Sequence, residues 1–234
     1  MTNPLASPPG MVRNRPEPSA GWVLRFDAVE RICHWATAAL FAILMTTALP
    51  LYFVQFESLV GRRALMADIH TWAGVALPVP LILSLVGPWG ARLRHDLRRV
   101  NLWTAAELRW LRTLGRLSLE APDKFNPGQK LNALFTGGVI VVMLATGSIL
   151  KWYRFFPLNW RTGATFVHDV LALSIFLVVT GHVAFALKHR EALRSMLSGR
   201  VTAAWARRHA SGWVDEERAA ADAGLVAERP SLPD

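Results

Sequence analysis

The sequence contains little of two things that soluble domains normally have. It has one cysteine, which excludes a disulfide within the chain and a cysteine-rich zinc or iron–sulfur cage. Charged residues make up only 18% of its 234 residues, against about 25% in an average soluble domain. Hydrophobic residues reach 52%, which excludes a disordered chain. The low charge and high hydrophobicity together point to segments that lie in a membrane.

Four windows of the sequence contain no Asp, Glu, Lys or Arg and are long enough to cross a bilayer: 32–56, 69–91, 131–150 and 170–187. At 1.5 Å of rise per residue each window approaches or exceeds the roughly 30 Å of hydrocarbon. We expect the last to begin a turn earlier, near Thr165. Backbone polar groups must be satisfied within such a segment, so the windows form helices. The predicted fold is an all-α membrane protein, a bundle of four transmembrane helices.

The basic residues are distributed unevenly between the two sides of these windows. Lys and Arg number 4 through residue 31, 9 from 92 to 130 and 8 from 188 onward, whereas the two remaining loops hold 2 and 3. The positive-inside rule then predicts cytoplasmic N- and C-termini. The net charge of +9 is explained by this topology, so no nucleic-acid partner is expected.

The ends of the chain differ from the middle in composition. Residues 1–24 are rich in proline and contain no apolar run of a signal peptide, so we interpret them as a flexible leader. Residues 25–190 form the predicted transmembrane domain. Residues 191–234 form a basic cytoplasmic tail, which is compatible with helix and could lie on an anionic leaflet or against a partner subunit.

Four of the seven histidines lie at membrane depth, where ionisable residues usually mark function. His168 and His182 are about 21 Å apart along the last helix and on nearly the same face. The first helix enters the membrane from the cytoplasm, which places His34 at the same depth as His182. The second helix enters from outside, which places His70 at the same depth as His168. Two histidines that face each other suit the axial positions of a haem iron. No C-x-x-C-H motif is present, so the pattern indicates two non-covalent haems b.

Other interpretations of these histidines remain open. Any one of them could make an interhelical hydrogen bond or cap a helix. A zinc site is disfavoured because no carboxylate or thiolate completes either layer beyond Asp169. A haem-free membrane anchor, or a small transporter whose histidines relay protons, is the alternative from a different functional class. A porphyrin between helices needs small residues nearby, and five glycines supply them: Gly74, Gly137, Gly138, Gly147 and Gly181.

Three strings of the sequence resemble a known family. They are FDAVERICHW at 26–35, KFNPGQK at 124–130, and GRV at 199–201 followed by WARRH at 205–209. They are similar to the gamma subunit of respiratory formate dehydrogenase, a dihaem cytochrome b, and the resemblance runs from about Arg25 to Trp213. It implies a multi-pass protein of the bacterial inner (plasma) membrane. It also implies a non-catalytic, electron-transfer subunit of an oxidoreductase complex.

The resemblance also implies a route for electrons in a respiratory chain. An iron–sulfur beta subunit drains a molybdenum- or tungsten-containing alpha subunit, and the cytochrome passes the electrons through two haems b to menaquinone or ubiquinone. Cytochromes b of hydrogenases and thiosulfate reductases share the bundle, so these partners remain an alternative. His70 and His168 would be the metal ligands of the outer haem, and His34 and His182 those of the inner haem.

By the same resemblance, the KFNPGQK string borders the inner haem where quinone binds, so Asn126, Gly128 and Gln129 are candidate quinone contacts. The residues alone also fit a helix start, with Asn126 as N-cap and Gln129 as the third residue of a capping box. The two roles are compatible, because a cap at the cytoplasmic interface places amide donors near a quinone carbonyl. Lys124 and Asp123 are candidates for proton uptake.

Overall fold

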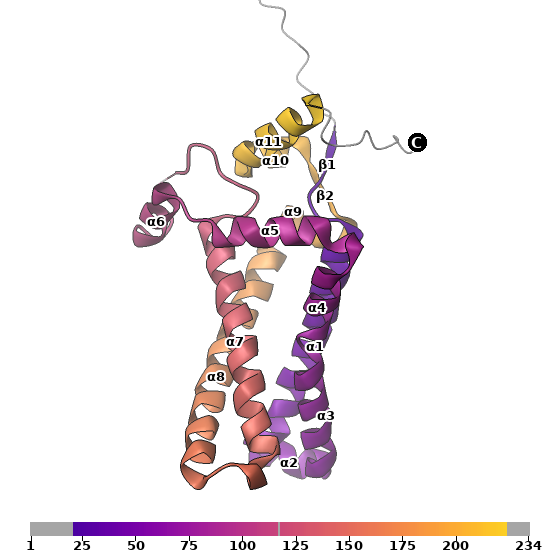
Figure 1. Ribbon diagram of the computed structural model, residues 1–234, viewed down its shortest axis with the longest axis vertical. Helices are drawn as coiled ribbons and strands as arrows, with labels where there is room; N and C mark the ends of the chain where they lie inside the picture. Colours follow the sequence, from indigo (N-terminus) through magenta and orange to yellow (C-terminus); the bar gives the residue numbers. More distant parts are fainter. Residues whose placement is uncertain (1–20, 117, 224–234) are drawn as a thin grey trace, which may run out of the picture.

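The protein is described from a computed structural model, which covers residues 21–116 and 118–223. Two antiparallel helix pairs stand side by side (Figure 1). In one pair, α1 (Ala28–Tyr52) packs against α3 (Arg63–Ala76) and α4 (Val79–Val86). In the other, α7 (Pro127–Lys151) packs against α8 (Leu158–Lys188), and α3 touches α7. These long helices form the body of the molecule.

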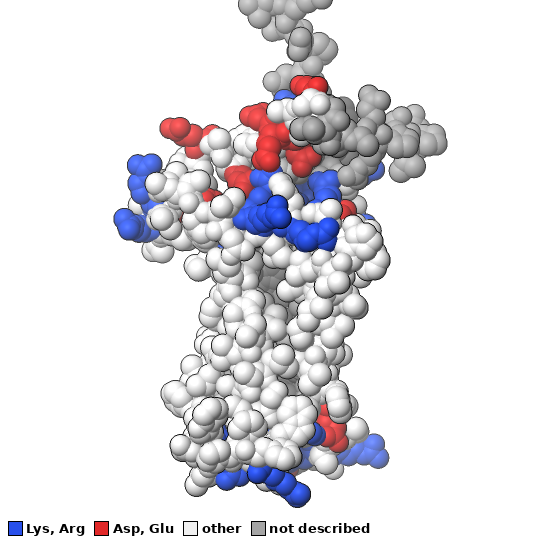
Figure 2. All heavy atoms as spheres, in the orientation of Figure 1, with Lys and Arg blue, Asp and Glu red and all other residues white. Residues whose placement is uncertain are grey.

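The body has the surface of a multi-pass membrane protein. Four segments are long and apolar enough to cross a membrane, namely Ala28–Tyr52, Arg63–Val86, Pro127–Lys151 and Leu158–Lys188. Their mean hydropathy runs from 1.7 to 2.4, and most of their side chains point outward. Figure 2 shows an uncharged band between two charged ends. The prediction of four apolar spanning helices is confirmed.

The helix boundaries differ from the charge-free windows for local reasons. The first helix begins at Ala28, because Asp27 and Glu30 form a reciprocal capping box with N–O distances of 2.9 and 2.7 Å. The last helix begins at Leu158, earlier than the expected start near Thr165, directly after Pro157. The second span is interrupted at Leu77 and Pro78, where proline lacks the N–H that a continuous helix needs.

A smaller layer of elements covers one end of the body, which we call the cap end (Figure 1). At the opposite end, called the far end, lie α2 (Val54–Val60) and the short η2 (Tyr153–Phe155). The layer at the cap end consists of β1 (Trp22–Leu24), η1 (Pro88–Gly90), α5 (Ala91–Asn101), α6 (Ala105–Arg112), α9 (Arg190–Ser198), β2 (Arg200–Thr202), α10 (Ala203–His209) and α11 (Ser211–Asp222).

The cap joins described segments that are far apart in the sequence. β1 pairs with β2 in antiparallel register, with Val23 opposite Val201. The segment 200–214 buries its own apolar cluster, in which Val201, Ala206 and Trp213 are at most 1% exposed. β1 thus connects the described end of the predicted leader to the predicted tail, and the described part of that tail forms helices and a strand. The remaining residues of the leader and tail lie outside the described residues.

Candidate functional site

The four histidines at membrane depth lie in two pairs. Near the cap end, His34 of α1 and His182 of α8 have ring centroids 6.2 Å apart and ring planes at 86°. Nearer the far end, His70 of α3 and His168 of α8 have centroids 6.4 Å apart and planes at 62°. We call these the cap-proximal pair and the cap-distal pair. The structure thus brings together the same partners that helix depth had matched.

Both pairs fit a haem iron with two axial ligands. A metal–imidazole bond is about 2 Å long and the bonding nitrogen lies about 1.1 Å from the ring centroid, so two imidazoles across one metal have centroids about 6 Å apart. Each pair supplies two ligands only, and the described residues contain no group of three or more His, Cys, Asp or Glu placed to hold a metal. A porphyrin, which provides the four equatorial nitrogens itself, suits such a donor set.

The glycines expected near the histidines have different surroundings. A Cβ at Gly147 would lie 3.4 Å from Cε1 of His168, so the absence of a side chain there lets the ring sit close to α7. Gly137, Gly138 and Gly181 face open space, since an added Cβ would meet nothing within 4 Å. A Cβ at Gly74 on α3 would meet only Leu44 Cδ2, at 3.8 Å. Of the five glycines, Gly147 is thus the one that the structure places against a histidine ring.

Two threonines contact the cap-distal pair. Thr47 Oγ1 on α1 lies 3.0 Å from Nδ1 of His70, and Thr146 Oγ1 on α7 lies 3.0 Å from Nδ1 of His168. Across the described part of the chain, the imidazole rings of His34 and His182 have no hydrogen-bonded partner. Neither threonine is predicted as a site residue from the sequence. The sequence contains one signal for them, which is a similar spacing within each helix pair. Thr47 precedes His70 by 23 residues, and Thr146 precedes His168 by 22.

Asn126 and Gln129 form the expected capping box at the start of α7. The Gln129 N–H donates to Asn126 Oδ1 at 2.9 Å, and the Asn126 N–H donates to Gln129 Oε1 at 3.0 Å. Gly128 lies between them, and a Cβ there would be 3.3 Å from Asn126 Oδ1. The box uses only the amide oxygens. Within the described residues the two amide nitrogens have no hydrogen-bond acceptor, so both remain available as donors.

The capping box lies close to the level of the cap-proximal pair. Thr146 on α7 is level with His168 on α8, as their contact shows. Because α7 and α8 run antiparallel, His182, 14 residues farther along α8, is level with a position on α7 near residue 132. Gln129 is about one turn of α7 from that position. The predicted quinone contacts and the cap-proximal pair therefore share one layer of the molecule.

A buried cluster of charged groups lies beside the same layer. Lys124 Nζ is 3.3 Å from Glu30 Oε1 and also contacts the carboxylate of Asp96, and the three side chains are 2 to 9% exposed. Arg25 donates to the Lys124 carbonyl at 2.9 Å. Burial lowers the pKa of Arg25 to about 10, although the negative charge of Asp96 acts to raise it. Glu30 is one turn before His34 on α1, so this buried ion cluster borders the cap-proximal pair.

Asp123, the other candidate for proton uptake, accepts from the backbone N–H of Lys124 at 2.7 Å but makes its ion pairs outside the buried ion cluster. Its carboxylate accepts from Arg99 at 2.6 Å and lies 3.8 Å from Lys130 Nζ. Lys130 in turn pairs with Glu107 at 2.7 Å. Asp123 therefore ties α5 to the start of α7, while Lys124 connects α5 to α1.

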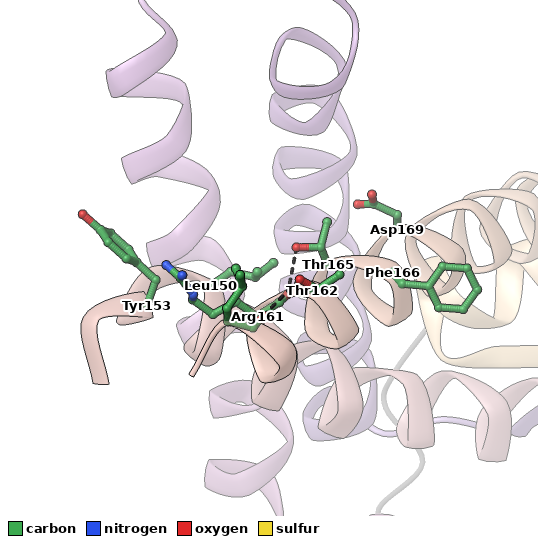
Figure 3. A pocket seen from close by; sticks show the side chains of 8 residues that line it. Leu150, Tyr153, Arg161, Thr162, Thr165, Phe166 and Asp169 are labelled. Atoms are coloured by element: carbon green, nitrogen blue, oxygen red, sulfur yellow. Dashed lines mark hydrogen bonds between the residues drawn. The ribbon is translucent and has the colours of Figure 1, made fainter. Parts of the chain in front are cut away.

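A groove of about 650 Å³ lies at the far end between the last turn of α7, η2 and α8 (Figure 3). Tyr153, Arg161 and Asp169 are among its lining residues, and none of the four histidines belongs to it. Asp169 is exposed there, although it follows His168 directly in the chain. The groove is therefore distinct from the histidine pairs.

Most of the chain is similar to known proteins. A family model described as prokaryotic cytochrome b561 matches residues 25–199. The cytochrome b556(fdo) subunit of formate dehydrogenase from Escherichia coli K12 is 26% identical over 84% of this chain and 93% of its own length. The nitrate-inducible cytochrome b556(Fdn) subunit from the same strain is 22% identical over 83% and 91%.

The cytochrome b556 subunit of formate dehydrogenase from Haemophilus influenzae is 24% identical over 83% of both chains. These matches confirm the resemblance to formate dehydrogenase cytochrome subunits across most of the chain. The match to the family model covers all four spans, all four membrane histidines and the start of α7. The chain belongs to the prokaryotic cytochrome b561 family.

Proposed function

We propose that this chain is the electron-transfer subunit of a formate dehydrogenase complex, passing electrons from an iron–sulfur subunit through two haems b to a quinone. Membership of the cytochrome b561 family implies haem b, and the relatives are cytochrome subunits of formate dehydrogenases. The observation that carries the proposal is the presence of two histidine pairs with centroids 6.2 and 6.4 Å apart.

In this proposal each histidine pair holds one haem. His70 and His168, the cap-distal pair, hold one haem, and His34 and His182, the cap-proximal pair, hold the other. A haem held by two histidines would supply reversible one-electron transfer. The chain's own task is to hold the two groups at fixed depths on one helix, about 21 Å apart along α8.

The distribution of basic residues supports an orientation for this transfer. In the sequence, the segments before the first span, between the second and third spans and after the fourth contain 21 of the 26 Lys and Arg residues. The described parts of these segments form the cap end, so the positive-inside rule assigns that end to the cytoplasm of a bacterial inner membrane. Electrons from the iron–sulfur subunit then enter at the far end and leave near the cap end. Negative charge moves inward, which contributes to the membrane potential.

Quinone reduction fits the cap end because the required groups lie together there. The amide nitrogens of Asn126 and Gln129 can donate to a quinone carbonyl, and Gly128 lets the backbone approach. Two electrons on a quinone must be joined by two protons, and this end lies beside cytosolic water. Menaquinone and ubiquinone both present the carbonyl that these donors would bind.

A haem count tests the proposal. The full chain, expressed in membranes and purified in detergent, is analysed by pyridine haemochrome assay together with a protein assay. We expect close to two haems b per chain. One haem would reduce the site to a single pair, and no haem would overturn the proposal in favour of a haem-free anchor or proton relay.

A second measurement tests the partner. Affinity purification of the chain from its native membranes should recover an iron–sulfur subunit and a molybdenum- or tungsten-containing subunit with formate dehydrogenase activity. Recovery of a hydrogenase or a thiosulfate reductase would keep the haems and replace the partner.

A further inference from the structure

Thr47 and Thr146 occupy equivalent places in the two helix pairs. Each lies on the first long helix of its pair, and each contacts Nδ1 of a histidine on the next long helix at 3.0 Å. Both are buried, with 5% and 8% of the residue surface exposed. Sites on two separate helix pairs therefore repeat one arrangement of hydroxyl and imidazole.

The hydroxyl proton of each threonine is already used within its own helix. Thr47 Oγ1 lies 2.7 Å from the carbonyl oxygen of Ile43, and Thr146 Oγ1 lies 2.8 Å from that of Val142. A carbonyl oxygen can only accept, so the single hydroxyl hydrogen points to it. Toward the imidazole each Oγ1 can therefore act only as an acceptor, and Nδ1 of His70 and of His168 must carry the hydrogen.

This assignment decides which ring nitrogen can bind a metal. A neutral imidazole has one N–H, so a hydrogen on Nδ1 leaves the lone pair on Nε2. We propose that Thr47 and Thr146 are positioning residues for the cap-distal haem, which lock the tautomer and orientation of His70 and His168 and reserve both Nε2 atoms for iron. The inference rests on the proposed function and extends it to the residues that support the ligands.

The same contacts differentiate the two haem positions. A hydrogen bond from the second ring nitrogen raises the basicity of a histidine ligand, and a more basic ligand stabilises ferric iron. The cap-proximal histidines have no such partner in the described structure. The threonines therefore lower the midpoint potential at the cap-distal pair relative to the cap-proximal pair, which makes electron transfer from the far end to the cap end favourable.

Other threonines show that the helical back-bond alone does not explain this arrangement. Thr46 and Thr71 donate to the carbonyl four residues earlier at 2.7 and 2.8 Å, but neither has a contact with a histidine. Thr46 is the direct neighbour of Thr47, and it is exposed. A Thr46→Val variant therefore removes the same kind of back-bond on the same helix without touching the cap-distal pair.

The test compares Thr47→Val, Thr146→Val and the double variant with Thr46→Val and with Thr47→Ser, which keeps the hydroxyl. Haem per chain is measured after gel filtration, and the two haems are resolved by redox titration of the alpha band and by low-spin electron paramagnetic resonance. We expect the valine variants to release the cap-distal haem with a 10- to 100-fold weaker affinity. Any cap-distal haem that remains should titrate at a higher potential with an altered signal.

The control outcomes are equally defined. Thr46→Val and Thr47→Ser should match the wild type, and the cap-proximal haem should titrate unchanged throughout. Valine variants with wild-type haem content, potential and resonance signal would overturn this inference while leaving the proposed function intact. A wild-type chain without haem would defeat the proposed function itself. If the double variant does not accumulate, the single variants decide between these outcomes, because each leaves one supported histidine in place.

Discussion

The two histidine pairs share one helix and nearly one spacing, yet their surroundings differ. The cap-distal pair has neutral hydroxyl partners on both rings. The cap-proximal pair has none among the described residues, and it lies one turn from Glu30 and the buried ion cluster. A pair with fixed tautomers suits electron transfer alone, whereas a pair beside ionisable groups suits a step that couples electrons to protons.

Removing one ligand from each pair is expected to have the largest effect. His70→Ala and His182→Ala should each lower the haem content from about two to about one per chain, because an axial ligand is lost. The functional losses should differ. His70→Ala should prevent reduction of the remaining haem by the partner subunit while quinol can still reduce it, and His182→Ala should abolish quinone reduction.

The haem content is measured by pyridine haemochrome assay, and haem reduction by the alpha band after addition of formate or quinol. His95→Ala, at an exposed position on α5, provides the control and should retain both haems. Equal functional losses in the two ligand variants would contradict the assignment of separate roles to the two pairs.

The next effect concerns the buried ion cluster. Lys124 is 2% exposed and lies between two carboxylates, so Lys124→Met removes the ammonium group that pairs with Glu30 and Asp96. Breaking a buried ion pair by removing one partner costs about 3–5 kcal/mol. We expect the cap to open at a lower temperature, which limited proteolysis across a temperature series detects. The haem at the cap-distal pair should be retained.

Lys188→Met removes an exposed lysine at the end of α8 and should leave the proteolysis profile unchanged. Adding Asp96→Asn to Lys124→Met should recover part of the stability, because one unpaired carboxylate is neutralised. A cap as resistant in Lys124→Met as in the wild type would mean that the buried ion cluster does not hold the cap on the body.

The sequence contains enough information for the spans and the histidine layers, because both depend on hydrophobic length and on the constant rise of a helix. The contacts of Thr47 and Thr146 with the histidine rings cannot be predicted from the sequence. A threonine in an apolar helix ordinarily bonds its own backbone, and only the packing of neighbouring helices shows which one meets an imidazole. The pairing of Val23 with Val201 is similarly hidden, since two three-residue strands far apart in the chain carry no periodic signal.

The last prediction concerns the quinone contacts. Asn126→Ala and Gln129→Ala each remove an amide donor near the cap-proximal pair, and each should weaken the binding of quinone or of a quinone-site inhibitor by about 1–3 kcal/mol. Equilibrium titration of purified, haem-loaded protein measures this affinity. The cap-distal pair is more than three turns of α8 away from His182, so the haem content of both variants should remain close to two per chain.

Thr104→Ala separates a lost donor from a lost helix cap. Thr104 and Glu107 form the same reciprocal box at the start of α6, with N–O distances of 2.8 and 3.2 Å. Removing that cap costs about 1 kcal/mol of helix stability and should leave inhibitor affinity unchanged. If Gln129→Ala lowers assembly or haem content while the surviving protein binds inhibitor normally, Asn126 and Gln129 serve only as a cap, and the quinone must bind elsewhere near the cap-proximal pair.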